Sequence, residues 1–465
     1  MYRFDGALIS FLPSQAFTKE QIMRNEASKT IRLALPIIIG EIAQMTLHII
    51  DTAMVGALSY KQLAAASLVL AATNIPFVFG IGMTISVSQM VSMAHGRRDS
   101  SQVSHYLYNG FILCSVTAII ISLAVASGTG LLFHLGQDAE VARLAVPFMQ
   151  LLAISIIPML LFMTLKQFTD GLEFTRTAMA LSLASMPVNI FLNWLLIYGN
   201  WGFPRLELAG AGWATLITRT LMFIVLAIII FRHNTFRRYI AVRRSQWSLK
   251  RKTLRELIYI GLPTSLQLGI EAGAFAISGI LIGTISAVAQ AAHQIALSSA
   301  SFTFMVSIGL AQAGSIRVSN AYGRNDWNRI ETIGKSALLT GLIYGALCAI
   351  GFAVFRNQIP KAFTENAEVL GMAGALLVFA AIFQISDCTQ AVGAGLLRGI
   401  KDVKAPTLFI AIAYWVIGLP AGYILAFVLH MGAVGIWLGF IIGLTLASAF
   451  LLARFLKMTK KNLTS

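Results

Sequence analysis

The chain has 465 residues, of which 57% are hydrophobic and only 12% charged. Soluble domains carry about a quarter charged residues, so this composition excludes ordinary globular, fibrous and disordered proteins and leaves a polytopic membrane protein. The formal charge of +16 fits either nucleic-acid binding or the basic cytoplasmic loops of a membrane protein. The positions of the charges along the chain decide between these two explanations.

Apolar runs long enough to cross a bilayer, about 20 residues each, recur along the whole chain. They predict an all-α polytopic membrane protein with twelve transmembrane helices. The predicted spans lie near 31–57, 62–93, 107–133, 143–167, 176–199, 208–232, 257–284, 289–320, 334–355, 367–394, 405–429 and 433–456.

Lys and Arg are distributed unevenly between successive loops. The chain ends and the even-numbered loops hold 29 of the 35 Lys and Arg residues, and the odd-numbered loops hold five. This count assigns Lys166 to the loop between spans four and five, Arg317 to the loop between spans eight and nine, and Arg398 to the loop between spans ten and eleven. Only Arg219 is assigned to a span. The positive-inside rule then predicts that both termini face the cytoplasm, and nucleic acid is not needed to explain the charge.

The chain contains an internal repeat. Residues 34–99 align without gaps on residues 261–326 at a fixed offset of 227, with 18 identities in 66 positions. Six spans in each half give both halves the same orientation, which predicts two lobes related by a pseudo-twofold parallel repeat. Two such lobes enclose a central cavity, and their rocking alternates access to it. This plan favours transport over a static scaffold.

The repeat and the basic segment between its halves divide the chain into five parts. We predict a cytoplasmic N-terminal tail (1–30), an N-lobe (31–232), a basic cytoplasmic linker (233–256), a C-lobe (257–456) and a cytoplasmic C-terminal tail (457–465).

Four carboxylates lie inside predicted spans, where an ionisable group costs several kcal/mol unless it faces a cavity or a partner. In span one, Glu41, Gln44, His48 and Asp51 are spaced by 3, 4 and 3 residues, so all four share one helix face. Such a stripe suits a cation or proton relay. The alternative is a polar stripe that joins helices by hydrogen bonds.

The C-lobe contains the other two carboxylates, Glu271 in span seven and Asp387 in span ten. In the repeat alignment Glu271 falls on Gln44 and Ser278 on Asp51, so the two lobes are chemically unequal. If Glu271 and Asp387 converge, they need a counter-cation such as Na+ or one shared proton. Gln390, three residues after Asp387, is a candidate supporting group.

Span five carries Asn189 and Asn193 one turn apart after Pro187, and they are equally compatible with a polar lining or with helix packing. We expect Arg219 to have a structural role. The three cysteines show no metal-binding or disulfide spacing, and the chain has no Walker A, GxSxG or HExxH motif. We therefore expect neither an enzyme nor a cofactor, and transport energy from an ion gradient.

The chain resembles the multidrug and toxic compound extrusion (MATE) family, in particular its bacterial NorM-like branch. The resemblance rests on residues 51–56 (DTAMVG), on 291–296 (AAHQIA, containing His293), on Asp387 and Gln390 followed by 397–399 (LRG), and on Asn189 and Asn193 before Tyr198. It covers nearly the full length of the chain.

The resemblance implies a twelve-helix antiporter of the bacterial inner membrane that exports organic, mainly cationic compounds against inward Na+ or H+. It implies a C-lobe cation site at Glu271 and Asp387, where Na+ is a candidate ligand, and an N-lobe group of Asp51, Asn189 and Asn193. Some relatives have Tyr one turn before the span-ten Asp, where this chain has Phe383.

We further expect a functional monomer whose partners are small organic cations and the lipid bilayer. The alternative function is that of a lipid-linked oligosaccharide flippase of the same superfamily. Such proteins line their cavity with several basic residues, whereas this count gives only Arg219.

Overall fold

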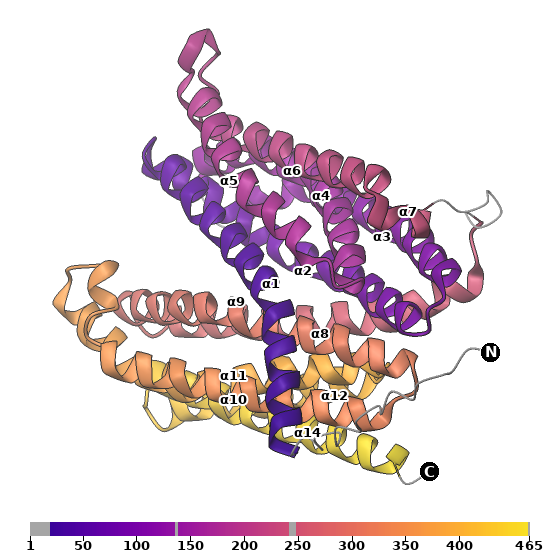
Figure 1. Ribbon diagram of the computed structural model, residues 1–465. Helices are drawn as coiled ribbons and strands as arrows, with labels where there is room; N and C mark the ends of the chain where they lie inside the picture. The colour runs from indigo at the N-terminus through magenta and orange to yellow at the C-terminus, as the bar shows by residue number, and fades with distance from the viewer. Residues whose placement is uncertain (1–18, 135–137, 241–247, 464–465) are drawn as a thin grey trace, which may run out of the picture.

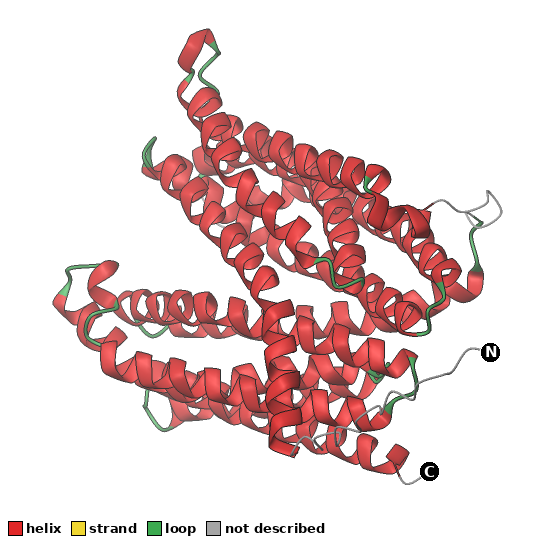
Figure 2. Ribbon diagram, viewed as in Figure 1, coloured by secondary structure: helices red, strands yellow, loops and turns green. Residues whose placement is uncertain are grey.

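The computed structural model describes residues 19–134, 138–240 and 248–463. These residues are almost entirely helical, with short connecting loops (Figure 2). The predicted tails and linker lie partly outside the described residues, including residues 1–18, Arg243, Arg244 and residues 464–465.

Twelve helical segments of the described chain are long and apolar enough to cross a membrane, which confirms the predicted fold class. The main helices are α1 (Lys19–Gly56), α2 (Tyr60–Gly96), α3 (Ser100–Ser127), α4 (Ala139–Gly171), α5 (Thr175–Tyr198), α6 (Glu207–Arg232), α7 (Asn234–Ile240), α8 (Arg251–Gly283), α9 (Ala287–Gly323), α10 (Trp327–Phe355), α11 (Ala367–Gly399), α12 (Lys404–Ala411), α13 (Leu419–Tyr423) and α14 (Ala433–Leu463). Span eleven combines α12 and α13 with two π-helical segments, η5 (Ile412–Gly418) and η6 (Ile424–Val428). Short 3-10 helices occur elsewhere in the described chain as η1 (Gly128–His134), η2 (Asn200–Gly202) and η4 (Pro360–Ala362).

The predicted repeat is visible in how the helices begin and end. α2 and α9 each have 37 residues and start after a serine cap, Ser59 and Ser286, whose hydroxyl accepts a backbone N–H of the first turn. Capping in this way satisfies amide donors that the helix leaves free. Both helices end in a turn whose left-handed residue, Arg98 or Asn325, is 227 positions from its counterpart. The same local chemistry therefore builds both halves.

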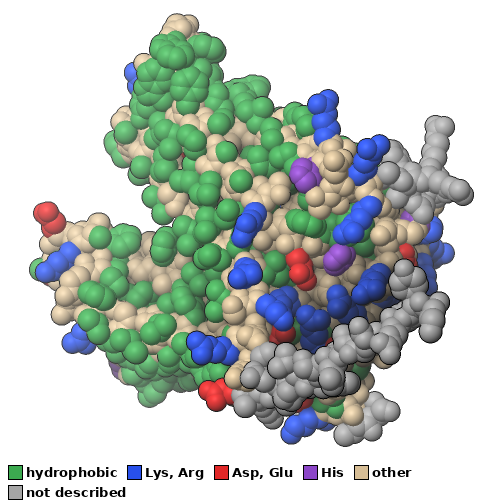
Figure 3. Space-filling model, in the orientation of Figure 1, with side chains coloured by type: hydrophobic (Ala, Val, Ile, Leu, Met, Phe, Trp, Pro, Cys, Tyr) green, Lys and Arg blue, Asp and Glu red, His purple; other side chains and the backbone are tan. Residues whose placement is uncertain are grey.

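The two lobes form a V (Figure 1). α2 and α9 end at the apex, which we call the closed face. There a Cβ on Gly96 would be 2.1 Å from the Asn320 carbonyl oxygen, and a Cβ on Gly323 would be 2.1 Å from that of Met93. At the opposite side, the open face, the surface is hollowed between the lobes (Figure 3).

Each lobe receives part of a helix from the other half of the sequence. The first half of α1 packs with Leu33, Ala34 and Ile37 in the C-lobe core, and α8 places Leu257 and Ile260 in the N-lobe core. α1 begins at Lys19, so the helix also extends into the segment 1–30 that we assigned to a tail. The lobes of the folded protein therefore differ from the predicted sequence segments at these two helices, α1 and α8.

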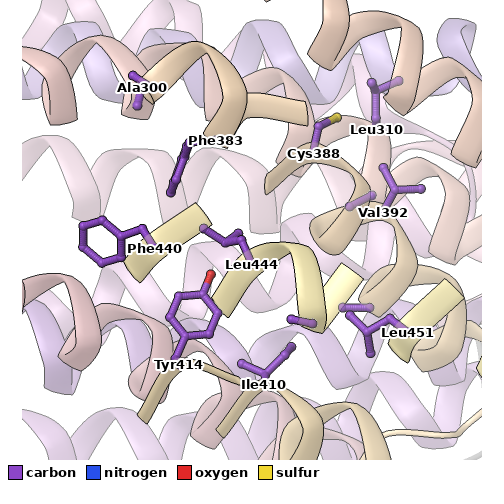
Figure 4. Close-up of a cluster of buried hydrophobic side chains, with 14 of the residues drawn as sticks. Ala300, Leu310, Phe383, Cys388, Val392, Ile410, Tyr414, Phe440, Leu444 and Leu451 are labelled. Carbon is purple, nitrogen blue, oxygen red and sulfur yellow. The ribbon is translucent and has the colours of Figure 1, made fainter. Parts of the chain in front are cut away.

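The C-lobe core is built from large side chains of α9, α11, η5 and α14, among them Phe383, Tyr414 and Phe440 (Figure 4). Exposed apolar side chains such as Ile120, Leu347 and Val354 lie on the outer helices. Apolar residues that face away from a protein core are stable in contact with lipid tails.

The assignment of three basic residues to loops was wrong. Lys166 lies inside α4 and is only 4% exposed, Arg317 lies inside α9 and is 6% exposed, and Arg398 lies in the last turn of α11. Lys166 and Arg317 lie within the last four residues of the predicted spans 143–167 and 289–320 but were counted with the loops, and α11 continues past the predicted span end at 394 to include Arg398. The interior of the molecule therefore contains more cationic groups than Arg219 alone.

Candidate ion-binding sites in the two lobes

The C-lobe site centres on Glu271, which is partly buried on α8. Its Oε1 atom accepts hydrogen bonds from Gln390 Nε2 on α11 at 2.7 Å and from Gln267 Nε2 at 3.2 Å. The hydroxyl of Tyr414, on η5, donates to Gln390 Oε1 at 2.8 Å. A continuous chain of polar groups therefore joins three spans within one lobe.

Asp387 lies one turn before Gln390 on α11 and is 6% exposed. It lies in the same part of the lobe as Glu271, because Gln390 on the same helix donates to the Glu271 carboxylate. No hydrogen bond reaches the Asp387 carboxyl group from the part of the chain that the structure describes. Two neighbouring carboxylates with little water favour sharing a proton or binding a cation. The carboxylate, amide and hydroxyl oxygens of this site are ligands that hard cations prefer.

The two other predicted C-lobe residues are buried apart from this hydrogen-bonded chain. The Ser278 hydroxyl has no partner among the described residues and lines a small cavity with Ala274 and Tyr414. His293, on α9, stacks edge-on against Trp437 with ring centroids 5.8 Å apart, and neither of its ring nitrogens has a described partner. Neither residue contacts Glu271 by a hydrogen bond in the described structure.

The N-lobe site is a second polar chain, running from α1 through α5 to α6. Asn193 Nδ2 lies 2.5 Å from Asp51 Oδ1 and 2.9 Å from Asn189 Oδ1. Asn189 in turn donates to Thr218 Oγ1 at 3.3 Å. The structure therefore brings together the three residues that the family resemblance implied for this lobe.

Asp51, Asn189 and Thr218 border a cavity of about 20 Å³, room for about one water molecule. Gln44, His48 and Asp51 line it from α1, and Arg219 lines it from α6. Arg219 also donates to Ser155 Oγ at 2.8 Å and lies over the Phe77 ring. Arg219 is therefore a fixed positive charge beside Asp51, in addition to the structural role that we expected.

Glu41 does not line this cavity, although it shares a helix face with Gln44. Its carboxylate is paired with Lys166 at 2.9 Å. The predicted four-residue stripe is therefore divided into a cavity group of three residues and a separate ion pair.

Sequence reasoning missed two residues that complete these sites. Tyr414 supplies a hydroxyl to the C-lobe site, while Phe383, where some relatives have Tyr, packs against Trp437 and Phe440. Lys166 was missed as the partner of Glu41. The available sequence signal was the position of this lysine within the last turn of the predicted span 143–167.

Twelve membrane-crossing helices in two repeated lobes, with carboxylates inside each lobe and a hollow between them, define a polytopic membrane transporter. Comparison with known proteins identifies its family. The MatE family model matches residues 36–195 and 263–424, one match in each half of the repeat. The chain therefore belongs to the MatE family.

Curated relatives match over nearly the full length. The chain is 33% identical to the "Probable multidrug resistance protein NorM" of Mesorhizobium japonicum, covering 97% of each chain. It is also 33% identical to the "Multidrug resistance protein NorM" of Vibrio cholerae, covering 94% of this chain and 97% of the relative. These matches place the chain among NorM-like members of the family, as the sequence motifs predicted.

Solved structures share the fold. The eukaryotic MATE transporter AtDTX14 superposes with a TM-score of 0.86 at 20% identity, covering 95% of this chain and 99% of that one. An "outward-facing conformation of a multidrug resistance MATE family transporter" superposes with a TM-score of 0.85 at 20% identity, covering 97% and 99%.

Proposed function

We propose that this protein is a secondary antiporter that exports organic, mainly cationic compounds in exchange for inward Na+ or H+. The names of the NorM relatives support drugs as the class of exported compound. Acidic groups in both lobes support positively charged ligands. Rocking of the two lobes would alternate access to the space between them.

The observation that carries the proposal is the position of Glu271 and Asp387 within one lobe. Asp387 is buried and has no described hydrogen-bond partner, while Glu271 is held by Gln267 and Gln390. Binding of one inward-moving cation or proton would cancel one of the two negative charges, and loss of that ion would restore the repulsion. A site with two such states can couple ion binding to lobe movement. The N-lobe group of Asp51, Asn189 and Asn193 is our second candidate site, for a cation, a proton or the cargo.

The charge pattern supports an orientation. Lys and Arg side chains gather on the side of the molecule where the lobes meet (Figure 3). By the positive-inside rule we propose that this closed face is cytoplasmic, that both termini lie there, and that the protein resides in a bacterial inner membrane. The proposed working unit is a monomer.

Conservative substitution of the two carboxylates tests the C-lobe site. We predict that Glu271→Gln and Asp387→Asn each abolish export driven by an ion gradient, because the single carboxylate that remains in either variant has no neighbouring like charge whose repulsion an ion could relieve. The measurement is export of a fluorescent organic cation from cells that carry equal amounts of each protein in the membrane.

Asp402→Asn is the matched control. Asp402 is an acid bound to Arg454 within the C-lobe, outside both sites, so this variant should export like the wild type. Normal export by both site variants would exclude the proposed C-lobe site.

A further inference from the structure

A buried charged cluster lies where α4 of the N-lobe meets α1. Lys166 Nζ is 2.9 Å from Glu41 Oε1 and 3.7 Å from Asp170 Oδ2. The side chains of Lys166 and Asp170 are 5% and 1% exposed, and that of Glu41 is 20% exposed. The site described in the N-lobe does not include any of these three residues.

The opposite lobe covers this cluster. Gln312, on α9, donates from Nε2 to Asp170 Oδ2 at 3.2 Å and to Gln167 Oε1 at 3.0 Å. Gln312 is itself 8% exposed. Separation of the lobes at the closed face would break both bonds and admit water to Asp170.

The cluster has one more acid than base. Two carboxylates and one ammonium leave an excess negative charge, and the Asp170 Oδ1 atom is buried without a hydrogen-bond partner in the described structure. Charge excess with an unpartnered carboxylate oxygen is costly away from water. A single proton on Asp170 removes the excess charge, so that the unpartnered oxygen belongs to a neutral group, whereas a metal ion would have to compete with the resident ammonium group.

The neighbouring charges do not supply the missing positive charge. On the same face, Arg317 from α9 is bound by Glu26 of α1, whose other partner is Lys29. From α2, His95 is within hydrogen-bond distance of Tyr239. The titratable groups that face one another in the cluster are therefore Glu41, Lys166 and Asp170, and α9 contributes only the neutral Gln312.

We propose that this cluster is an additional proton site, which takes up one proton when the lobes close on it and releases that proton to the cytoplasm when they separate. The proposal rests on the antiporter function and orientation given above. The chemistry is protonation of a carboxylate, in which one proton from water converts the Asp170 carboxylate to a carboxyl group. Burial favours the neutral form and hydration favours the charged form, so acid should stabilise the closed contact.

The test measures the closed contact directly in the full-length protein. Spin labels on cysteines introduced at Ser100 and Asn328, two exposed positions at the closed-face ends of the two lobes, report their separation in nanodiscs without cargo or gradient. In the wild type we expect the fraction with the short distance to rise as the pH falls. Asp170→Asn makes the cluster neutral without a proton, so its distances should stay short at every pH.

A second variant and a control keep the test decisive. Glu41→Gln removes the same excess charge from a different helix, so its label distances should also stay short at all pH values. The label distances of Asp402→Asn should depend on pH as those of the wild type do. A wild type that does not respond to pH, or a wild-type response in both cluster variants, would overturn the proposal. Neither result would affect the export assay of Glu271 and Asp387, so the two proposals fail separately.

Discussion

At the scale of single residues, the C-lobe site obtains its tyrosine hydroxyl from an unexpected place. Phe383 occupies the position where some relatives carry Tyr, and it is buried among Trp437 and Phe440. Tyr414, from a different span, instead orients the Gln390 amide that holds Glu271. The amide thus presents its N–H group to Glu271 because its carbonyl oxygen is already bound.

Removal of the Tyr414 hydroxyl should weaken the site without destroying it. A neutral hydrogen bond contributes about 1 kcal/mol, so Tyr414→Phe should raise the ion concentration for half-maximal export by about fivefold. The measurement is export against Na+ or H+ concentration in membrane vesicles. Tyr423→Phe, at a half-exposed position of the same span, is the control. An unchanged ion requirement in Tyr414→Phe would show that the hydroxyl does not support the site.

The polar residues of α1 show what helical spacing in a sequence can and cannot predict about a site. Helical spacing correctly grouped Gln44, His48 and Asp51 on one cavity, because local periodicity determines a helix face. It did not separate Glu41 from them, because the partner Lys166 is 125 positions away in the sequence. Long-range pairing of charges depends on tertiary packing, which periodicity does not contain.

At the scale of helices, the close approach of α2 and α9 depends on glycine. A methyl group on Gly96 would lie 2.1 Å from the Asn320 carbonyl oxygen, an approach that backbone atoms cannot relieve without moving the helices apart. Overpacking typically costs about 1–3 kcal/mol. Because Gly96 and Asn320 belong to opposite lobes, this cost falls on the closed contact.

We therefore predict that Gly96→Ala shifts the molecule towards separation at the closed face. The label pair at Ser100 and Asn328 should show a larger fraction of long distances at any given pH. Gly351→Ala, on α10, has no neighbouring atom within 4 Å of the added Cβ and should leave the distances unchanged. If Gly96→Ala shows the same distribution of label distances as the wild type, this contact does not control closure.

The sequence repeat predicted that these two helices are equivalent, but hydropathy did not predict where all of the helices begin. The fixed offset of 227 correctly predicted that α2 and α9 are equivalent, because capping serines and terminal glycines were copied with the apolar pattern. It did not predict the start of α1 at Lys19. Hydropathy detects the part of a helix that lies in lipid, whereas polar turns beyond it, which pack on another lobe, have no apolar signal.

At the scale of the whole molecule, the lobes are joined at one face and separated at the other (Figure 1). The halves of α1 and α8 that cross between lobes carry Pro36 and Pro263, again 227 positions apart. Proline removes a helix hydrogen bond and permits bending, so both crossing helices can bend at equivalent points as the lobes rock. In the proposed antiport cycle, the candidate site in each lobe and the contact between the lobes would act together.

Antiport by this protein is tested by ion movement that cargo drives in proteoliposomes. An imposed gradient of a fluorescent organic cation should drive Na+ or H+ in the opposite direction without ATP, and Asp387→Asn should remove this coupled ion movement. A pH-sensitive and a Na+-sensitive dye in parallel vesicles identify the ion. Cargo transport by the wild type without any opposing movement of Na+ or H+ would contradict antiport.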